Sequence, residues 1–344
     1  MQTVPCYLCG DKGTLLYQGM KDRHFAAQGE WGFRKCCKPE CGLVWLDPMP
    51  AEQDIGGFYE DFYTHDSARS QAGGLSFAAQ AGRFAVKQIN SIVKSLTAGR
   101  QSSRQINLMF LGEKTPGKLL EIGCGSGERL ARLKKLGWQA EGQDIDPKAV
   151  GHARERFGLE VHCGDVCTLA LPGDSFDAII MNHVIEHLPD PVKVLAECHR
   201  LLKRSGTLVL TTPNTASYGH NHFQSAWLGL DPPRHLYLFS RTALSVVARK
   251  SGFQDYSIET TPARAQSFAT GSYEIQRTGR HALNLKPHPR AEWAGLVFQI
   301  RALRAHSRNP DSGEECVLKA VKMQCLSKQE RFKKKLWEKN LFMR

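Results

Sequence analysis

The stretch LLEIGCGSGERL, residues 119–130, runs from an apolar segment through three alternate glycines into a helix-forming segment. A strand that turns through glycines into a helix is typical of α/β folds that bind nucleotides, because glycine lets the backbone approach a ligand closely. The residues around the glycines decide which nucleotide such a turn can hold.

Two common nucleotide-binding turns do not match this stretch. A dinucleotide turn of the G-x-G-x-x-G type that starts at Gly123 would place its third glycine at position 128, where the chain has Glu128. A phosphate-binding P-loop ends in Gly-Lys-Ser or Gly-Lys-Thr, and GSGERL contains neither. The sequence therefore argues against a dinucleotide and against a nucleoside triphosphate.

Acidic residues near the turn indicate a different ligand. Glu121 precedes the glycines, Asp144 stands at the end of the next predicted strand, and Asp165 follows the third. A carboxylate after the second strand can accept both hydroxyl hydrogen bonds of a ribose, and one after the third can accept from an adenine amino group. The predicted ligand carries an adenosine and a cationic end, and no phosphate.

Strands and helices alternate from residue 117 onward. The predicted strands are KLLEIG, WQAEGQDI, LEVHCGD, FDAIIMN and GTLVLTTP, and the predicted helices are ERLARLKKLG, PKAVGHARERFG and DPVKVLAECHRLLK. After an irregular stretch and a further helix, the segments FQDYSIET and ECVLKAVKM are also strand-like. This alternation predicts a parallel sheet with helices on both faces and a ligand outside the carboxyl ends of the strands.

Residues 117 to about 213 resemble the class I S-adenosylmethionine-dependent methyltransferases through five ordered motifs: EIGCGSG, GQDID, GD, FDAIIMNHVIEHLPDP and LLKRSGTLVLTTPN. The resemblance implies an α/β fold with a Rossmann-like seven-stranded sheet and S-adenosylmethionine as cofactor. It also implies the cofactor-binding residues, which are Gly123, Gly125 and Gly127 at the methionine portion, Asp144 at the ribose, Asp165 and Val166 at the adenine, and Asn182 or His183 near the sulfonium. We expect Glu121, before the glycines, to be a cofactor-binding residue as well.

Five of the eleven cysteines lie within the first 41 residues. Cys6 and Cys9 have the spacing of a zinc knuckle, and the second pair is Cys41 with either Cys36 or Cys37. Related methyltransferases carry a similar N-terminal zinc-ribbon-like module, and this resemblance favours Cys36 as the ligand. Four cysteine ligands leave no open position, so the predicted zinc is structural, with free or redox-active thiols as the alternative.

Histidines are the candidates for the base that removes a proton from the methyl acceptor. The segment NHVIEH places His183 and His187 one helical turn apart, at the mouth of the predicted cofactor crevice. We expect His187 to be the base, and His235 of PPRHLYLFS is its rival because similar enzymes carry a histidine in the lid after the fifth strand. We expect His220 and His222 on a surface loop.

Four segments are predicted. They are a zinc-ribbon-like module (1–50), a helical connector or cap (51–115), the methyltransferase domain (116–325) and a basic C-terminal tail (326–344). The stretch SKQERFKKKLWEKNLFMR holds seven Lys or Arg and two Glu, and peripheral contact with a membrane through it stays open. There is no run of about 18 apolar residues and no leader pattern, so we expect a cytoplasmic protein without a membrane span.

The expected function is methyl transfer to a small-molecule acceptor, the hydroxyl of a sugar, glycan or lipid-linked intermediate. C-methylation of a keto-deoxysugar is the closest alternative. The net charge of +12 motivates a nucleic-acid methyltransferase as a second class, but basic residues near the site do not interleave with aromatics, so we do not expect a nucleic-acid partner. A regulator that binds the cofactor without turnover is the third class. The sequence gives no oligomeric state.

Overall fold

The computed structural model describes residues 4–59, 104–281 and 287–323. Most of the predicted connector and the whole basic tail therefore lie outside the described residues. The described strands and helices are β1 (Thr14–Met20), β2 (Trp31–Lys35), β3 (Val44–Asp47), α1 (Glu52–Ile55), β4 (Lys118–Ile122), α4 (Glu128–Lys135), β5 (Gln139–Asp144), α5 (Pro147–Phe157), β6 (Glu160–Cys163), β7 (Phe176–Asn182), α6 (Pro191–Leu201), β8 (Leu202–Pro213), α7 (Tyr218–Phe223), β9 (Tyr237–Leu238), α8 (Arg241–Lys250), β10 (Asp255–Thr261), α9 (Ala265–Thr278), α10 (Pro289–Arg308) and β11 (Glu315–Val321).

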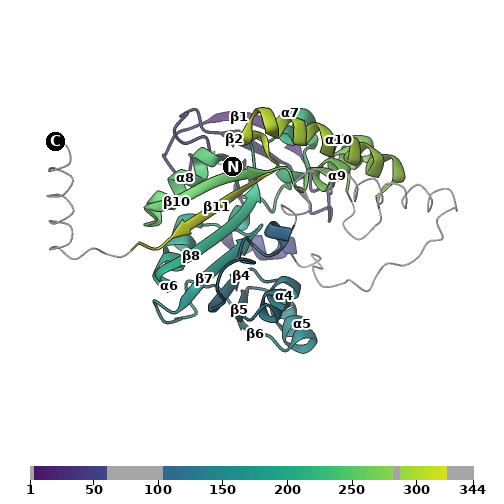
Figure 1. The fold of residues 1–344 in the computed structure, drawn as a ribbon. Helices are drawn as coiled ribbons and strands as arrows, with labels where there is room; N and C mark the ends of the chain where they lie inside the picture. Colours follow the sequence, from purple (N-terminus) through teal and green to yellow (C-terminus); the bar gives the residue numbers. More distant parts are fainter. Residues whose placement is uncertain (1–3, 60–103, 282–286, 324–344) are drawn as a thin grey trace, which may run out of the picture.

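The main sheet has seven strands in the order β10-β11-β8-β7-β4-β5-β6. The pairs β8·β7, β7·β4, β4·β5 and β5·β6 are parallel, whereas β11 runs antiparallel to both of its neighbours. The predicted seven-stranded α/β sheet is confirmed (Figure 1). The chain crosses from one side of β4 to the other between β6 and β7, so the carboxyl end of β4 lies where a ligand crevice is expected.

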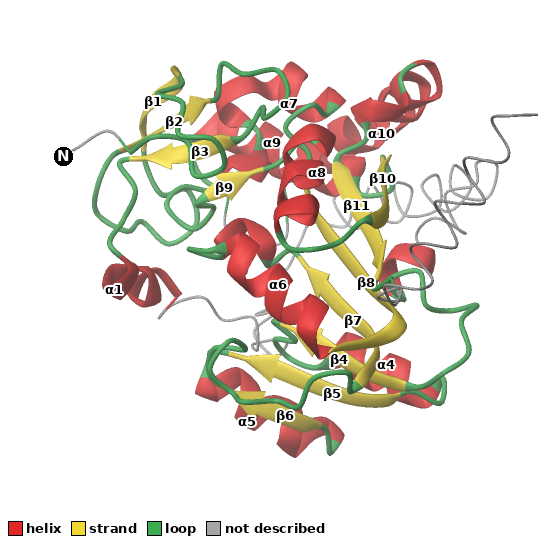
Figure 2. Cartoon of the chain, turned by 90° about the vertical axis from the view of Figure 1, so that its left-hand side faces the viewer, coloured by secondary structure: helices red, strands yellow, loops and turns green. Residues whose placement is uncertain are grey.

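Helices cover both faces of this sheet, as predicted. Leu120 and Ile122 of β4 belong to a hydrophobic cluster that includes residues of α6 and α8, whereas Leu119 belongs to a second cluster with residues of α4 and α5. Figure 2 shows α6 and α8 in front of the strands. Alternate residues of a strand point to opposite faces, so one strand contributes to two cores. These two cores fix the end of β4, where the glycine turn begins.

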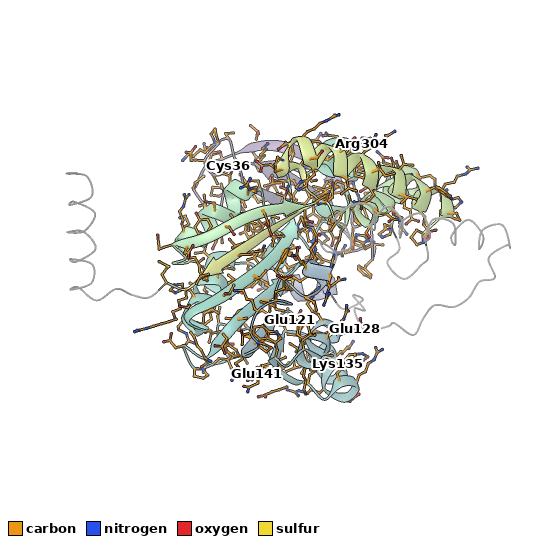
Figure 3. The ribbon with its side chains drawn as sticks, in the orientation of Figure 1. Cys36, Glu121, Glu128, Lys135, Glu141 and Arg304 are labelled. Atoms are coloured by element: carbon orange, nitrogen blue, oxygen red, sulfur yellow. The ribbon has the colours of Figure 1, made fainter. Side chains whose placement is uncertain are left out.

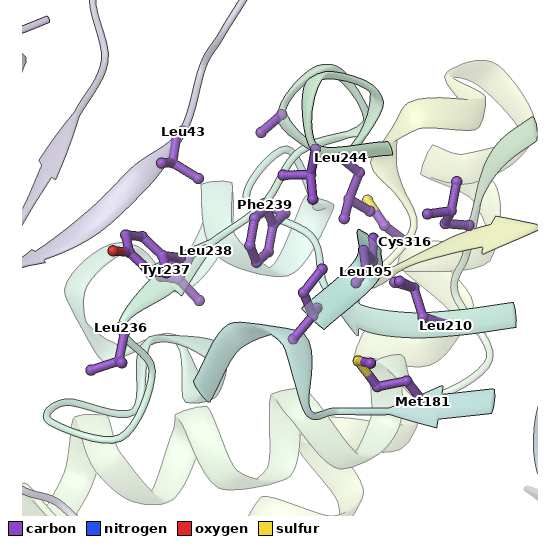
Figure 4. Close-up of a cluster of buried hydrophobic side chains, with 14 of the residues drawn as sticks. Leu43, Met181, Leu195, Leu210, Leu236, Tyr237, Leu238, Phe239, Leu244 and Cys316 are labelled. Atoms are coloured by element: carbon purple, nitrogen blue, oxygen red, sulfur yellow. The ribbon is translucent and has the colours of Figure 1, made fainter. Parts of the chain in front are cut away.

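A second sheet joins the N-terminal segment to the segment that follows β8, after Pro213. This segment is called the lid below. Its order is β1-β2-β3-β9, and β9 pairs with β3 in antiparallel register, Val44 opposite Leu238 and Trp45 opposite Tyr237. Figure 4 shows Leu43 in the same buried cluster as Leu238 and Phe239. Because β3 and β9 share a ladder and a core, the N-terminal segment holds the lid in place.

The stretch between β8 and β9 is more ordered than its sequence indicated. It contains α7 and two turns of 3-10 helix, Gln224–Ala226 and Leu228–Leu230. The long helices α9 and α10 pack against each other and against α7. None of the helices in the described part of the chain combines the length and apolar character that crossing a bilayer requires.

Candidate active site

The glycine turn links β4 to α4 and has a left-handed backbone at all three glycines. The φ angles of Gly123, Gly125 and Gly127 are 65°, 52° and 76°. A Cβ atom on Gly123 would lie 2.4 Å from Val184 Cγ2, and one on Gly127 would lie 2.7 Å from Leu159 Cδ1. A Cβ atom on Gly125 would meet no protein atom within 4 Å. Only the middle glycine therefore faces space that a ligand could fill.

Asp144 is tied directly to this turn. The backbone N–H of Gly125 donates to Asp144 Oδ2 at 2.8 Å, and the N–H of Asp146 donates to Asp144 Oδ1 at 3.0 Å. The acid that ends the second strand thus lies beside the one glycine that faces open space. This is the arrangement that the sequence spacing predicted for a carboxylate at a ribose.

Glu121 is almost fully buried at the end of β4, with 1% of its surface exposed (Figure 3). Its Oε1 accepts from Arg129 Nη1 at 2.9 Å, but its Oε2 has no hydrogen-bond partner among the described residues. Burial raises the pKa of Glu121, and the charge of Arg129 opposes that rise. An orphaned, buried carboxylate oxygen at the base of the open turn is a group that a cationic ligand would satisfy. The carboxylate of Glu121 therefore fits a cofactor with a positively charged end.

The remaining predicted cofactor residues lie at the ends of β6 and β7, the edge of the sheet that also carries the glycine turn. Asp165 is exposed and its Oδ1 accepts from the N–H of Cys167 at 3.0 Å, while Val166 is 3% exposed. Asn182 Oδ1 accepts from the hydroxyl of Thr211 at 2.9 Å. An exposed carboxylate next to a buried apolar side chain suits an adenine ring, which has a polar edge and apolar faces.

His183 is held between two buried carboxylates. Its Nδ1 lies 3.1 Å from Glu186 Oε1, and its Nε2 lies 2.6 Å from Glu315 Oε1. Burial alone would lower the pKa of His183, but the hydrogen bonds to Glu186 and Glu315 outweigh it and raise the pKa to about 9. The imidazole is therefore charged at neutral pH and cannot act as a general base there.

His187 and His235 form a close pair, with ring centroids 4.7 Å apart. The Nδ1 of His187 lies 3.1 Å from the carbonyl oxygen of Arg234, and the Nδ1 of His235 lies 2.8 Å from that of Gly229. A carbonyl oxygen only accepts, so each Nδ1 carries a hydrogen, and in the uncharged ring Nε2 is the basic atom. Burial and the neighbouring His235 lower the pKa of His187 to about 4, so this ring is uncharged at neutral pH.

Glu186, the residue before His187 in the chain, completes this group. Its Oε1 accepts from His183 and its Oε2 from the hydroxyl of Thr212, at 2.9 Å. Burial opposes ionisation, but the hydrogen bond from His183 lowers the pKa of Glu186 to about 2. Ligand atoms of Glu186, His187 and His235 all lie within 4.8 Å of one another, so the group could share a proton or hold a divalent cation.

A buried charge network supports the loop that carries His235. Arg234 is fully buried and donates to Asp22 Oδ1 at 2.7 Å and to Asp231 Oδ1 at 2.6 Å. His24 Nε2 also approaches Asp231 Oδ1, at 3.4 Å. Sequence analysis missed these partners because Asp22 and Arg234 lie far apart in the chain and have no motif spacing. In the segment PPRH, the sequence indicated a role only for the histidine.

The four predicted zinc ligands come together in the N-terminal segment. The sulfur atoms of Cys6 and Cys41 are 3.6 Å apart, those of Cys9 and Cys36 are 3.4 Å apart, and all four lie within 4.8 Å of one another. Zinc–sulfur bonds of about 2.3 Å in a tetrahedron place the sulfurs about 3.8 Å apart, so the size of the cluster fits the ion. Cys37 is exposed and lies outside this cluster.

The expectation for His220 was wrong. His220 lies on α7 with 8% of its surface exposed, its Nδ1 lies 2.7 Å from the carbonyl oxygen of Thr215, and its ring packs 4.8 Å from that of Trp227. Its Nε2 lies 3.0 Å from the hydroxyl of Tyr17 in β1. His220 therefore packs between the lid and the N-terminal sheet. His222 is exposed, as expected, but it also lies on α7 and not on a loop.

Residues 97–258 match a family model described as a methyltransferase domain. A probable S-adenosylmethionine-dependent methyltransferase of Mycobacterium tuberculosis is 37% identical over 101 residues, which are 29% of this chain and 37% of that protein. A ubiquinone biosynthesis O-methyltransferase of Parvibaculum lavamentivorans is 33% identical over 108 residues, 30% of this chain and 43% of the relative. This chain thus spans less than half the length of each of these relatives.

A malonyl-[acyl-carrier protein] O-methyltransferase of Paenibacillus is 30% identical over 181 residues, covering 48% of this chain and 65% of that protein. Among solved structures, an S-adenosylmethionine-dependent methyltransferase from Archaeoglobus fulgidus is 22% identical with a TM-score of 0.43, covering 65% of this chain and 92% of the other. The matched domain contains β4 to β8 and the glycine turn. The chain therefore contains a methyltransferase domain, and this domain is similar to those of S-adenosylmethionine-dependent methyltransferases.

Proposed function

We propose that this protein transfers a methyl group from S-adenosylmethionine to the hydroxyl oxygen of a small-molecule acceptor. The observation that carries the proposal is the open, left-handed turn at Gly125, with Asp144 bound to it and a buried, half-satisfied Glu121 at its base. The cofactor supplies a methyl group that is already activated on a sulfonium, so the protein has only to align the acceptor and remove its proton.

In this proposal Glu121, Gly125, Asp144, Asp165 and Val166 hold the cofactor. Asp144 has the hydrogen-bonding capacity for a ribose, and its tie to the turn fixes its orientation before the ligand arrives. Asn182 and His183 stand at the end of β7, on the same edge of the sheet. His183 contributes a fixed positive charge that keeps Glu186 and Glu315 ionised in the protein interior.

His187 and His235 are the proposed bases. In both rings Nε2 lies on the side away from the carbonyl oxygen that Nδ1 meets, and His235 is 8% exposed whereas His187 is partly buried. An uncharged imidazole can take a proton from a hydroxyl that is being methylated. The second imidazole, whose ring centroid lies 4.7 Å from that of the first, can then accept this proton. C-methylation of a keto-deoxysugar would use the same pair.

The names of two relatives specify O-methylation, one in ubiquinone biosynthesis and one of malonyl-[acyl-carrier protein], and neither name specifies a sugar. Transfer to an oxygen is therefore the favoured chemistry. A sugar, glycan or lipid-linked hydroxyl as acceptor stays a prediction.

We also propose a structural zinc ion bound by Cys6, Cys9, Cys36 and Cys41. The sulfur positions support it, and the second sheet places this cluster on the segment that clamps the lid through β9. Zinc there would act on folding of the N-terminal segment and on the position of the lid, with no part in the chemical step.

The function can be tested by binding and turnover measured on the same variants. S-adenosylmethionine binding is measured by calorimetry, and methyl transfer is screened against nucleotide sugars, phenols and acyl thioesters. We expect Asp144→Ala to abolish cofactor binding, and His187→Ala and His235→Ala to lower turnover by about 100-fold or more while leaving cofactor affinity within a few-fold. His222→Ala, on the exposed histidine, is the matched control. Equal losses of affinity and turnover in the His187 and His235 variants would contradict their assignment as bases.

A further inference from the structure

Helix α10 turns an unusual set of side chains towards solvent. Six of the exposed residues follow one another at intervals of three or four positions, which places them on a single face of the helix. They are Arg290, Trp293, Val297, Arg301, Arg304 and Arg308, and they are called the α10 stripe below. Figure 3 places Arg304 at the outer edge of the molecule.

The opposite face of α10 already anchors the helix to the protein. Ala291, Leu296, Phe298 and Ala302 are buried, and the ring of Phe298 packs 5.1 Å from that of Tyr218 in α7. The fold of this region therefore does not depend on the α10 stripe. Trp293 and Val297 nevertheless remain 39% and 46% exposed, among the few large apolar side chains that the described surface shows to water.

The charge of the stripe is uncompensated within the described chain. No ion pair involves Arg290, Arg301, Arg304 or Arg308 among the described residues, although surface pairs such as Lys322 with Asp174 occur elsewhere. Helices α9 and α10 together, with the described part of their connection, carry six arginines and two glutamates. Glu274, one of the two glutamates, hydrogen-bonds His281 and the N–H of His288, so it is engaged away from the stripe.

We propose that the α10 stripe binds the surface of an anionic lipid membrane. Arginines attract anionic headgroups, and a tryptophan with a small apolar neighbour suits the boundary between headgroups and acyl chains. The stripe contains both in one line along a helix whose inner face is held rigidly. A single-stranded nucleic acid would require several aromatic side chains along a groove, and the stripe offers one tryptophan on a convex helix.

Helix α9 connects α10 to the proposed active site, since α9 packs against α10. Phe268 of α9 has its ring 6.5 Å from that of His183, and the hydroxyl of Ser272 in α9 accepts from the N–H of Leu228 in the lid. A membrane bound at α10 would therefore be linked to the proposed active site through α9, which contacts both. The binding itself does not depend on the acceptor or on turnover, so it can be tested separately from the proposed function.

The experiment is co-sedimentation of the full-length protein with vesicles of phosphatidylcholine alone or of phosphatidylcholine with phosphatidylglycerol. We expect binding only to the anionic vesicles, weakening as salt rises. The double variant Arg301→Gln/Arg304→Gln should lower the partition coefficient about 30-fold, because each arginine near an anionic surface contributes about one kcal/mol. The control is Arg249→Gln/Lys250→Gln on α8, an equal change of charge on another exposed site, which should retain binding.

Two further variants decide between explanations. Trp293→Ala should weaken vesicle binding without changing the net charge, which a purely electrostatic association would not show. Substituting Lys333, Lys334 and Lys335 of the C-terminal tail by Gln should leave most of the binding in place. The proposal is overturned if the tail variant alone loses binding, if the α8 control loses as much as the α10 variant, or if α10 binds single-stranded RNA and not vesicles. Unchanged cofactor affinity and melting temperature confirm that each variant is folded.

Discussion

The guanidinium group of Arg234 forms a two-pronged ion pair with the carboxylate of Asp22, and neither side chain is exposed to solvent. Asp22 lies just after β1 in the N-terminal segment, whereas Arg234 lies in the lid immediately before His235. Asp231 binds the same guanidinium group from within the lid. The pair thus connects the segment that carries the cysteine cluster to the loop that carries a proposed base.

Removing the carboxylate of Asp22 should destabilise the protein strongly. Asp22→Ala would leave Arg234 buried with one of its two described carboxylate partners, Asp231, and breaking a buried pair in this way costs about 3–5 kcal/mol in the free energy of unfolding. Urea unfolding of the full chain measures this. Glu30→Gln, which breaks the exposed pair between Lys21 and Glu30, should cost less than about 1 kcal/mol. Similar losses in both variants would show that the Arg234 network does not hold the lid.

The charge on His183 should make stability depend on pH in the alkaline range. Its pKa in the folded protein is about 9, against about 6.5 in an unfolded chain, because Glu186 and Glu315 bind its charged form. The contribution of charged His183 to the free energy of unfolding is therefore complete below about pH 6.5 and is lost as the pH rises through 9. This contribution is at most roughly 3 kcal/mol. Urea unfolding between pH 6 and about pH 10 measures it. His183→Gln should flatten this dependence, and His222→Gln should leave it unchanged.

The sequence predicted the parts of the site that depend on neighbours in the chain. The glycine turn, Asp144 and Asp165 follow strands whose order is fixed by the alternation of apolar segments, so their position at one edge of the sheet could be derived. The charge state of His183 could not be derived, because it depends on Glu315, which β11 brings to the site from 132 residues away. The motif identified His183 as a residue near the cofactor, but not as a cation.

Contacts between distant parts of the chain also explain why the sequence predicts an irregular lid. Strand β9 is two residues long and exists because Val44 and Trp45 of β3 offer it a partner. Such a strand has too few residues to show an alternating pattern of its own. His220 was placed at the surface for a similar reason, since its burial depends on Trp227 and on Tyr17 from the distant β1.

Zinc content should distinguish Cys36 from Cys37. Cys36→Ser removes a sulfur from the cluster of four, so we expect zinc, measured by elemental analysis of the purified protein, to fall from about one ion per chain to near zero. The neighbouring Cys37 is exposed and outside the cluster, so Cys37→Ser should retain the metal. Removal of zinc by a chelator should lower the melting temperature of the unmodified protein. Full zinc content in both variants would contradict the proposed ligand set.

The two glycines Gly123 and Gly125 should respond differently to the same substitution. Both have a left-handed backbone, which costs a residue with a side chain about 1–2 kcal/mol, but only at Gly123 would the new methyl group also meet Val184, at 2.4 Å. We therefore expect Gly123→Ala to lower the melting temperature more than Gly125→Ala.

Gly125→Ala places its methyl group in open space beside Asp144, so we expect it to weaken S-adenosylmethionine binding at least tenfold with a small change in stability. Adding Val184→Ala to Gly123→Ala should restore part of the lost stability, because it removes the clash and leaves only the backbone strain. If Gly125→Ala binds the cofactor as tightly as the unmodified protein, the open side of the turn is not the cofactor site.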